Sequence, residues 1–200
     1  MDRYWLLTWT TYGSWLPGDR RGFVGKLRDE IGQPIIHNEP GTPCDADIPP
    51  LERAMRAGMK GELIRLTSEQ AGILLDQFRE TAEYRQWKLL GAAIMANHIH
   101  LVVGVCGDPE PEQILHCFKS YASRSLNRKC ARRINGTWWT ASGSKRKLPH
   151  AEAVQNALRY LRTQAHPLLI WIDESFTETE VSREASGGSY APGNEQSPGA

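Results

Sequence analysis

The sequence predicts an α+β domain with a ferredoxin-like βαββαβ core, an antiparallel sheet and an additional helix near the C-terminal end. Three observations predict this class. Runs rich in aromatic and β-branched residues fit strands, and segments with apolar residues at helical spacing lie between them. Two of the apolar runs are separated by only two residues, which indicates an antiparallel pair.

The predicted elements follow in a simple order. They are a strand over 4–10, a helix over 67–86, strands over 87–95 and 98–105, a helix after Pro111, a strand over 137–141, a helix over 150–164 and a further strand over 168–172. Thr67 and Gln70 form a capping-box pattern at the start of the first helix. Trp138 and Trp139 suggest the strand after the second helix. The last helix is expected to end before Pro167, because the residue preceding a proline disfavours helical backbone.

We expect a single domain over residues 1–174, since 200 residues can form one sizeable core. Residues 25–61 hold five of the twelve prolines and little periodicity, which predicts a loop-rich insertion with a short helix near 51–56. Residues 175–200 are polar and acidic, with Gly, Ser and Pro near the end, and are predicted to form a disordered tail.

The composition excludes several classes of protein. With 40% hydrophobic and 24% charged residues, the chain is neither collagenous nor wholly disordered. It has no apolar run of the roughly 18 residues that a bilayer requires, and its first residues lack a secretory pattern. Four widely spaced cysteines do not form a disulfide framework. These features predict a cytoplasmic protein without a membrane partner.

The net charge of +1 conceals a segregation of charge along the chain. Residues 113–151 contain nine basic residues and no acid, whereas 173–200 carry six acids and only Arg183 as a base. The basic residues are Lys119, Arg124, Arg128, Lys129, Arg132, Arg133, Lys145, Arg146 and Lys147. Such a stretch can neutralise nucleic-acid phosphates, although a solvated helix face and loop would look the same. Trp15, Trp138 and Trp139 could stack on unpaired bases or belong to the core.

The sharpest local pattern is His98-Ile99-His100 in a predicted strand. Alternation places both imidazoles on one face, roughly 7 Å apart along the chain, where they can chelate one cation. Two hydrogen-bonded histidines at the end of a sheet are the simpler interpretation of this pattern alone. A closed zinc site would need four ligands, and the cysteines show no pairing that supplies them.

A second pattern lies on the last predicted helix, where Tyr160 and Gln164 are four residues apart and share one face. By spacing alone, Tyr160 could be an amphipathic residue with its hydroxyl in water, and Gln164 a solvated residue near a helix end.

Together these patterns resemble the single-tyrosine HUH transposases, in which U is a bulky apolar residue, and in particular the REP-associated tyrosine transposases. The matching blocks are Met-Ala-Asn-His-Ile-His-Leu-Val-Val (95–103), Ala-Leu-Arg-Tyr-Leu-Arg-Thr-Gln (157–164), Trp-Thr-Thr-Tyr-Gly-Ser-Trp-Leu-Pro-Gly-Asp (9–19) and Trp-Trp-Thr-Ala-Ser-Gly-Ser (138–144). The resemblance extends over roughly Tyr4 to Ile172.

The resemblance implies an enzyme that cleaves and rejoins single-stranded DNA at the hairpins of a mobile element. Tyr160 would be the nucleophile and would keep the 5′ phosphate as a phosphotyrosine. His98, His100 and Gln164 would hold Mg²⁺ or Mn²⁺. The chain departs from many REP-associated relatives by having His166-Pro167 where they have Asn-Pro, so His166 is a rival third ligand.

The expected partner is single-stranded or hairpin DNA. Insertion-sequence relatives work as homodimers with shared sites, whereas REP-associated relatives can act as monomers, so both states are considered. Two other functions belong to different classes: a domesticated hairpin-binding protein without cleavage, and a relaxase or replication-initiator nuclease.

Overall fold

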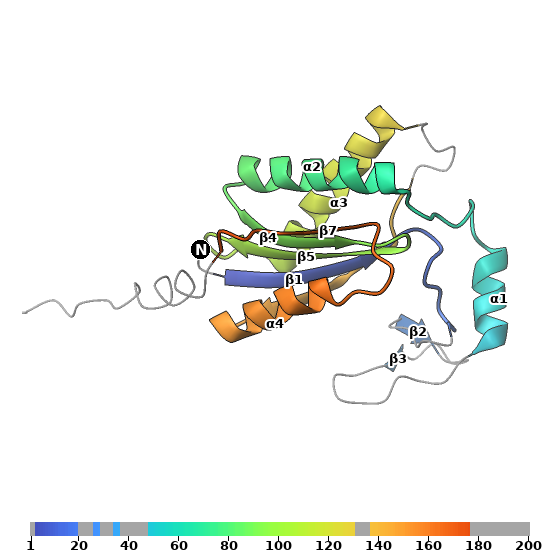
Figure 1. Ribbon diagram of the computed structural model, residues 1–200. Helices are drawn as coiled ribbons and strands as arrows, with labels where there is room; N and C mark the ends of the chain where they lie inside the picture. The colour runs from blue at the N-terminus through green and yellow to red at the C-terminus, as the bar shows by residue number, and fades with distance from the viewer. Residues whose placement is uncertain (1–2, 20–25, 29–33, 37–47, 131–136, 177–200) are drawn as a thin grey trace, which may run out of the picture.

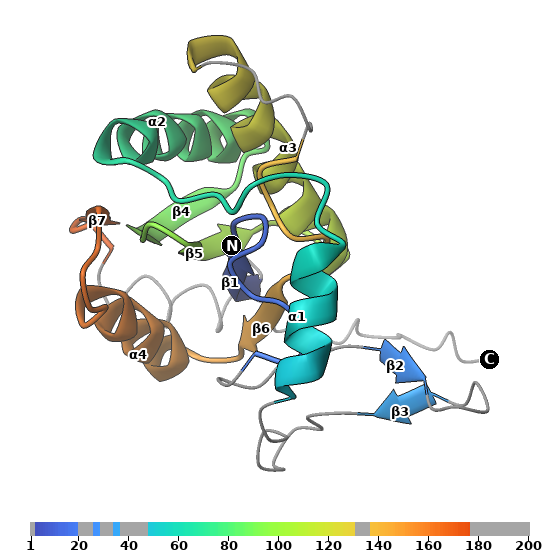
Figure 2. The same cartoon turned by 90° about the vertical axis from the view of Figure 1, so that its right-hand side faces the viewer.

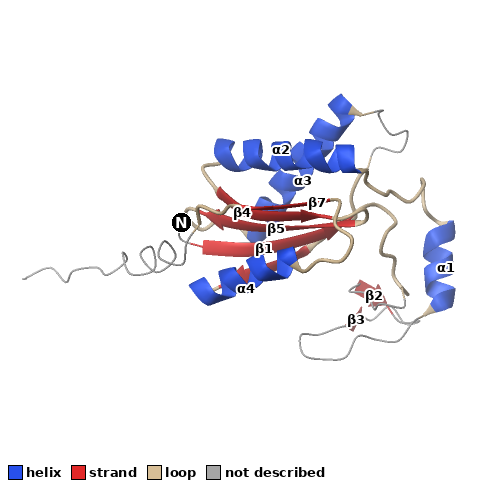
Figure 3. Cartoon of the chain, viewed as in Figure 1, coloured by secondary structure: helices blue, strands red, loops and turns tan. Residues whose placement is uncertain are grey.

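The computed structural model describes residues 3–19, 26–28, 34–36, 48–130 and 137–176 (Figure 1). Seven strands and four helices occur in these ranges (Figure 3). They are β1 (Arg3–Thr10), β2 (Lys26–Arg28), β3 (Pro34–Ile36), α1 (Pro49–Ala57), α2 (Ser68–Tyr84), β4 (Lys88–Ile94), β5 (His98–Val105), α3 (Pro111–Lys129), β6 (Ser144–Leu148), α4 (Ala151–Arg162) and β7 (Leu169–Ile172).

The main sheet has five strands in the order β6-β1-β5-β4-β7, and every neighbouring pair is antiparallel. Without β7, the strands of the βαββαβ unit lie in the order fourth, first, third, second, which is the ferredoxin-like arrangement. The predicted fold class is therefore confirmed. β2 and β3 form a separate two-stranded ribbon.

Helices cover both faces of the sheet (Figures 1 and 2). α2 and α3 pack on one face, and α4 packs on the other. Because side chains alternate along a strand, β5 contributes to two cores. Ile99 and Leu101 lie in the core beneath α2 and α3, whereas Val102 lies in the core with Leu158 and Leu161 of α4. β5 is thus fully buried except at its first residue, His98, which is half-buried.

The predicted start of the first long helix is confirmed in detail. The Thr67 hydroxyl accepts a hydrogen bond from the Gln70 backbone, and the Gln70 side chain accepts one from the Thr67 backbone. These two bonds satisfy donors that a helix start otherwise leaves unpaired. The predicted strands at 4–10, 87–95, 98–105 and 168–172 and the helices at 51–56, 111 onward and 150–164 are also present, with boundaries that differ by a few residues.

The predicted strand over 137–141 is wrong. Trp138 and Trp139 are both buried although they are consecutive, and the segment contributes only an isolated bridge between Thr11 and Trp139. The fourth strand of the core is β6, which pairs with β1 from the basic run that follows. Gly143 permits the approach between these segments, because a Cβ there would lie 2.6 Å from the Thr8 carbonyl oxygen.

Two further predictions fall partly outside the described ranges. Of the insertion at 25–61, the structure describes β2, β3 and residues from 48 onward, including α1. Of the acidic tail, it describes only Ser175 and Phe176, and Phe176 is buried against Tyr4 with ring centroids 6.1 Å apart. The packed part of the chain therefore reaches at least Phe176. In the described part of the chain, no helix is long and apolar enough to cross a membrane.

Candidate active site

The two histidines of the His-x-His pattern lie side by side on the α4 face of β5. Their ring centroids are 4.9 Å apart and their planes nearly perpendicular. The sheet register sets Thr8 opposite His100 and Thr10 opposite His98, so this end of the face carries polar side chains. His100 is buried and His98 half-buried. The strand thus presents two imidazoles together at one edge of the α4 core.

Each imidazole is oriented through its Nδ1 atom. The Nδ1 of His98 lies 2.7 Å from the Asn97 side-chain oxygen, and the Nδ1 of His100 lies 2.7 Å from the Thr8 hydroxyl. Because the amide oxygen of Asn97 can only accept, His98 must carry its proton on Nδ1. This leaves Nε2 of a neutral His98 with a lone pair, as a metal ligand requires.

Burial lowers the pKa of the His100 imidazole to about 4. The neighbouring charge of His98 acts in the same direction, and a hydrogen bond to the Gln164 side chain opposes it. His100 is therefore neutral at pH 7, and a neutral imidazole is the form that binds a metal ion.

α4 brings Tyr160 to this pair. The phenolic oxygen lies 3.5 Å from Nε2 of His100, and the two ring centroids are 5.2 Å apart. The opposite stripe of the helix, which includes Leu158 and Leu161, is buried in the core. Tyr160 itself remains 45% exposed. Gly91 of β4 permits close packing of the helix, because a Cβ there would lie 2.9 Å from a methyl carbon of Leu158.

The two candidates for a third ligand differ in position. Gln164 is half-buried and its side chain contacts His100, while its amide nitrogen donates to the Tyr160 carbonyl over 3.1 Å. That bond leaves the amide oxygen as the atom suited to a cation. His166 is exposed and has a positive φ of 52°. Within the described ranges, no three side chains of the His, Cys, Asp and Glu types lie close enough together to hold a metal ion, so His166 does not join the imidazole pair.

A cavity of about 640 Å³ opens next to this constellation. Strand β6 and helix α4 form much of its wall, with His100 and Tyr160 at one side. Arg146 also lines it, since residues Ser144, Arg146 and Leu148 point to the α4 face of β6. The Arg146 side chain forms no ion pair with any other residue in the described part of the chain, so it is available to a phosphate.

Those basic residues predicted to bind DNA that the structure describes lie on different surfaces. Lys145 points to the α3 face of β6, where its ammonium lies 2.7 Å from the Glu112 carboxylate. Arg124 lies over the Tyr121 ring of α3, and Arg128 donates to the Gln77 side chain over 3.4 Å. Lys129 and Lys147 are exposed, and Arg132 and Arg133 lie outside the described residues.

The Lys119 side chain is hydrogen-bonded within the protein. Its ammonium donates to the backbone carbonyls of Thr140, Ala141 and Ser142 over 2.6 to 3.1 Å. Burial, with the charge of Lys145 second, lowers the pKa of Lys119 to about 8, so the group is still charged at pH 7. All three ammonium donors have acceptors, which indicates a structural role for this side chain.

The three tryptophans that were candidates for stacking on bases differ in burial. Trp138 and Trp139 are buried, and their indole nitrogens donate to the Asn127 side chain and the Lys119 carbonyl. They therefore belong to the core and cannot stack on bases. Trp15 is 42% exposed.

Sequence reasoning missed the role of Thr8. It has no motif of its own, and only the pairing of β1 with β5 sets it opposite His100. Asn97 had a visible signal, because it directly precedes the first histidine of the pattern.

The fold and the site together define an α+β domain with an imidazole pair facing a helix-borne tyrosine. A sequence model described as "Transposase IS200 like" matches residues 62–164, just over half of the chain. The chain therefore belongs to the IS200-like transposase family. The matched range contains His98, His100, Tyr160 and Gln164. Strand β1 precedes this range in the sequence, although it lies between β6 and β5 in the main sheet.

Two solved structures are similar to the chain at low identity. One is the REP-associated tyrosine transposase bound to a REP hairpin, with 10% identity, a TM-score of 0.44 and coverage of 80% of this chain. The chain spans 64% of the length of that protein. The other is a protein of Deinococcus radiodurans R1 described as a candidate transposase, with 14% identity, a TM-score of 0.43 and coverage of 83% of this chain and 94% of that one. No curated protein matches the chain.

Proposed function

We propose that the chain cleaves and rejoins single-stranded DNA at hairpin-bearing ends of a mobile element, with Tyr160 as the nucleophile. The observation that carries this proposal is the approach of the Tyr160 hydroxyl to Nε2 of His100, over 3.5 Å, beside the ring of His98. A protein that only bound hairpins would have no need to bring a half-exposed phenol to a paired imidazole site.

The reaction is an exchange of phosphate esters. The Tyr160 oxygen attacks phosphorus and gives up its proton, and the bond from phosphorus to the 3′ oxygen breaks as that oxygen takes up a proton. The 5′ phosphate stays on the tyrosine, and the free 3′ hydroxyl can reverse the step. Since one ester replaces another, no nucleotide hydrolysis is required.

His98, His100 and Gln164 fit a divalent cation, Mg²⁺ or Mn²⁺, because both imidazoles are oriented through Nδ1 and the glutamine is left with its amide oxygen. Such an ion supplies Lewis-acid polarisation of the scissile phosphate. α4 carries both Tyr160 and Gln164, so one rigid element positions the nucleophile and a ligand.

Arg146 is the basic residue best placed to hold the scissile strand, because it lines the same cavity as His100 and Tyr160. The exposed basic side chains of α3, together with Lys147, would contact the phosphates of the hairpin stem, farther from the cavity. We assign the site to a single chain, since Tyr160 and His100 of the same chain meet. The domain that carries this site extends through at least Phe176, which is buried.

The test is cation-dependent cleavage. Labelled hairpin DNA from the flanks of the gene that encodes the chain is incubated with the protein, first with EDTA and then with added Mg²⁺ or Mn²⁺. We expect no cutting in EDTA and recovery with the cation. His98→Ala and His100→Ala should lose both cutting and Mn²⁺ binding measured by calorimetry, because each removes an imidazole ligand.

His116→Ala is the matched control, since His116 is exposed on α3 and, among the residues that the structure describes, forms a hydrogen bond only with Ser120 of its own helix. It should cut and bind Mn²⁺ like the wild type. Full cleavage in EDTA, or unchanged Mn²⁺ affinity in both ligand variants, would contradict the metal assignment.

A further inference from the structure

Thr8 of β1 lies in a row of side chains that crosses the sheet beside Tyr160. The register sets His100 of β5 opposite Thr8 on one side and Ser144 of β6 opposite it on the other. All three residues line the cavity of about 640 Å³ that Tyr160 also lines. Thr8 is half-buried, so its side chain contacts His100 and also reaches the cavity.

The Thr8 hydroxyl has a single hydrogen-bond partner in the described part of the chain. Its oxygen lies 2.7 Å from Nδ1 of His100. The Ser144 hydroxyl forms no hydrogen bond with it, although the two residues are opposite each other. A hydroxyl offers one donor and two acceptor positions, so one bond to an imidazole leaves part of this capacity unused.

The direction of the bond follows from the use of His100 as a ligand. A neutral imidazole carries one proton, and a cation on Nε2 requires that this proton is on Nδ1. Nδ1 is then the donor and the Thr8 oxygen is the acceptor. The hydroxyl hydrogen of Thr8 is therefore not used by His100, and no other residue that the structure describes accepts it.

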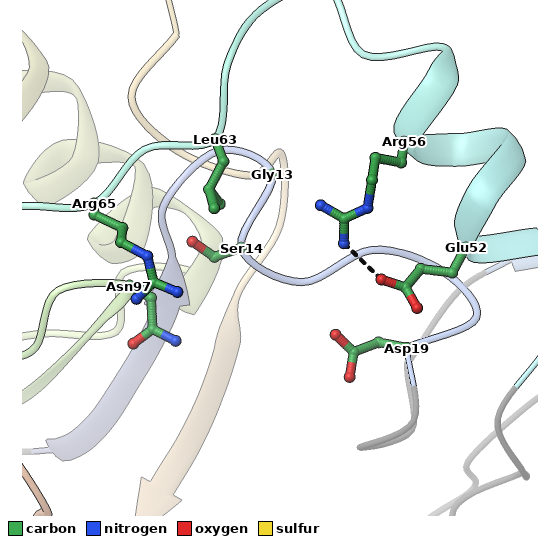
Figure 4. Close-up of a pocket in the computed structure, with 8 residues that line it drawn as sticks. All are labelled: Gly13, Ser14, Asp19, Glu52, Arg56, Leu63, Arg65 and Asn97. Atoms are coloured by element: carbon green, nitrogen blue, oxygen red, sulfur yellow. Dashed lines mark hydrogen bonds and ion pairs between the residues drawn. The ribbon is translucent and has the colours of Figure 1, made fainter. Parts of the chain in front are cut away.

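The partner of the other imidazole differs in this respect. Asn97 accepts from Nδ1 of His98 through its side-chain oxygen, which has no hydrogen to donate. The Asn97 side chain lines a separate cavity of about 410 Å³ (Figure 4) and does not line the cavity beside Tyr160. Of the two groups that orient the imidazoles, only Thr8 thus reaches the cavity next to the candidate nucleophile.

The proposed substrate supplies an acceptor for the Thr8 hydrogen. Arg146 lies two residues after Ser144 on β6, lines the same cavity and points to the same face of the sheet as Thr8. Under the proposed function, Arg146 and Tyr160 contact the scissile phosphate in this cavity. Threonine hydroxyls are common donors to phosphate oxygens, and a charged acceptor strengthens such a bond.

We propose that the Thr8 hydroxyl connects the cation site to the substrate: it accepts from Nδ1 of His100 and donates its own hydrogen to an oxygen of the scissile phosphate. The first bond keeps Nε2 directed toward the cation, and the second holds the phosphate near Tyr160. Thr8 is therefore a positioning residue for His100 and a binding residue for the strand. This inference rests on the proposed function, because it takes His100 as a ligand and single-stranded DNA as the substrate.

Thr8→Val tests both bonds, because valine has nearly the shape of threonine and favours strands but has no hydroxyl. Mn²⁺ affinity without DNA, measured by calorimetry, should fall about tenfold, since Nδ1 of His100 loses its acceptor. In single-turnover assays at saturating Mn²⁺, the rate of hairpin cleavage should still be about tenfold below that of the wild type, because the phosphate has lost a donor.

Two further variants complete the test. Thr8→Ser should keep both properties close to those of the wild type, since serine retains the hydroxyl. Thr81→Val is the matched control, because it removes a threonine hydroxyl that donates to the Gln77 carbonyl over 2.7 Å within α2, on the other face of the sheet. It should bind Mn²⁺ and cut like the wild type. Thermal denaturation checks that each variant is folded.

The outcomes separate the two levels of inference. If the wild type binds Mn²⁺ and cleaves but Thr8→Val has the same Mn²⁺ affinity, or recovers the full rate at saturating Mn²⁺, the assignment of Thr8 is wrong and the proposed function stands. Equal losses in Thr8→Ser and Thr8→Val would also contradict the role of the hydroxyl. If the wild type neither binds Mn²⁺ nor cleaves hairpin DNA, both inferences are wrong.

Discussion

Lys119 shows why a basic residue in a basic stretch need not contact DNA. Its ammonium satisfies three carbonyl oxygens of the segment at 140–142, directly after the buried tryptophans. The sequence alone does not distinguish this lysine from the other basic residues of the stretch, because charge is visible in a sequence and hydrogen-bond partners are not. The distinction depends on the packing of α3 against that segment.

We expect Lys119→Met to lower the free energy of unfolding by about 1 to 2 kcal/mol, because it leaves carbonyl groups without their donor. Hairpin affinity and its salt dependence should stay close to those of the wild type. Urea denaturation and binding titrations at several salt concentrations measure both effects. Lys129→Met, at an exposed position of the same helix, should leave stability unchanged. Unchanged stability of Lys119→Met with a reduced salt slope would instead make Lys119 a phosphate contact.

At the residue scale, the histidine pair could be predicted because strand alternation fixes which side chains share a face. The structure places His98 and His100 together, with Ile99 in the opposite core, as that argument requires. Thr8 could not be predicted, because its contact with His100 depends on the register of two strands that are distant in sequence.

At the scale of elements, β6 divides the basic run Lys145-Arg146-Lys147 between the two faces of the sheet. Arg146 lines the cavity beside Tyr160, whereas Lys145 pairs with Glu112 on the α3 side. Because side chains alternate along a strand, Arg146 points to the candidate site while its neighbours Lys145 and Lys147 point to the other face of the sheet.

We predict that Arg146→Ala reduces the rate of cleavage about tenfold or more, because a guanidinium beside the nucleophile stabilises charge on the scissile phosphate. Lys147→Ala should stay within about twofold of the wild type, since this exposed residue points to the other face of the sheet. Single-turnover kinetics on labelled hairpin DNA compare the two. Equal losses in both variants would indicate a diffuse charge effect and contradict the placement of Arg146.

β6 also shows where the prediction of elements failed. Trp138 and Trp139 fit strand propensity, but both are buried and anchored by indole hydrogen bonds, so they pack as a core segment. The true strand is polar because it lies at the edge of the sheet, where lysine and arginine are common. Propensity identifies buried strands more readily than charged edge strands.

At the scale of the whole molecule, the order of elements and the ferredoxin-like sheet were predictable from periodicity and from the short connection at Ala96-Asn97. The position of the insertion could not be predicted from the sequence, because loop segments are placed by tertiary contacts. Gly18 illustrates this dependence: a Cβ there would lie 2.6 Å from backbone atoms of Ile48 and Glu52, so the β1 loop and the start of α1 must meet closely.

The arrangement of Tyr160 and His100 in one chain predicts that the site does not need a second subunit. Co-expressed His100→Ala and Tyr160→Phe chains should therefore fail to cut hairpin DNA, since each chain lacks one half of its own site. Co-purification through two different tags establishes whether mixed dimers form. Recovery of cutting in such a mixture would show that the tyrosine of one subunit serves the histidines of another.

The most direct test of the account is the identity of the covalent adduct. Wild type and Tyr160→Phe are incubated with hairpin DNA labelled at its 5′ or 3′ end, and the products are separated on a denaturing gel before peptide mapping. Phenylalanine removes the attacking oxygen and little else, and Tyr160 is half-exposed, so folding and hairpin affinity should be retained. The account predicts that only the wild type becomes joined, through Tyr160, to the 5′ phosphate of the strand on the 3′ side of the cut. Undiminished cleavage by Tyr160→Phe, or an adduct on another tyrosine, would contradict it.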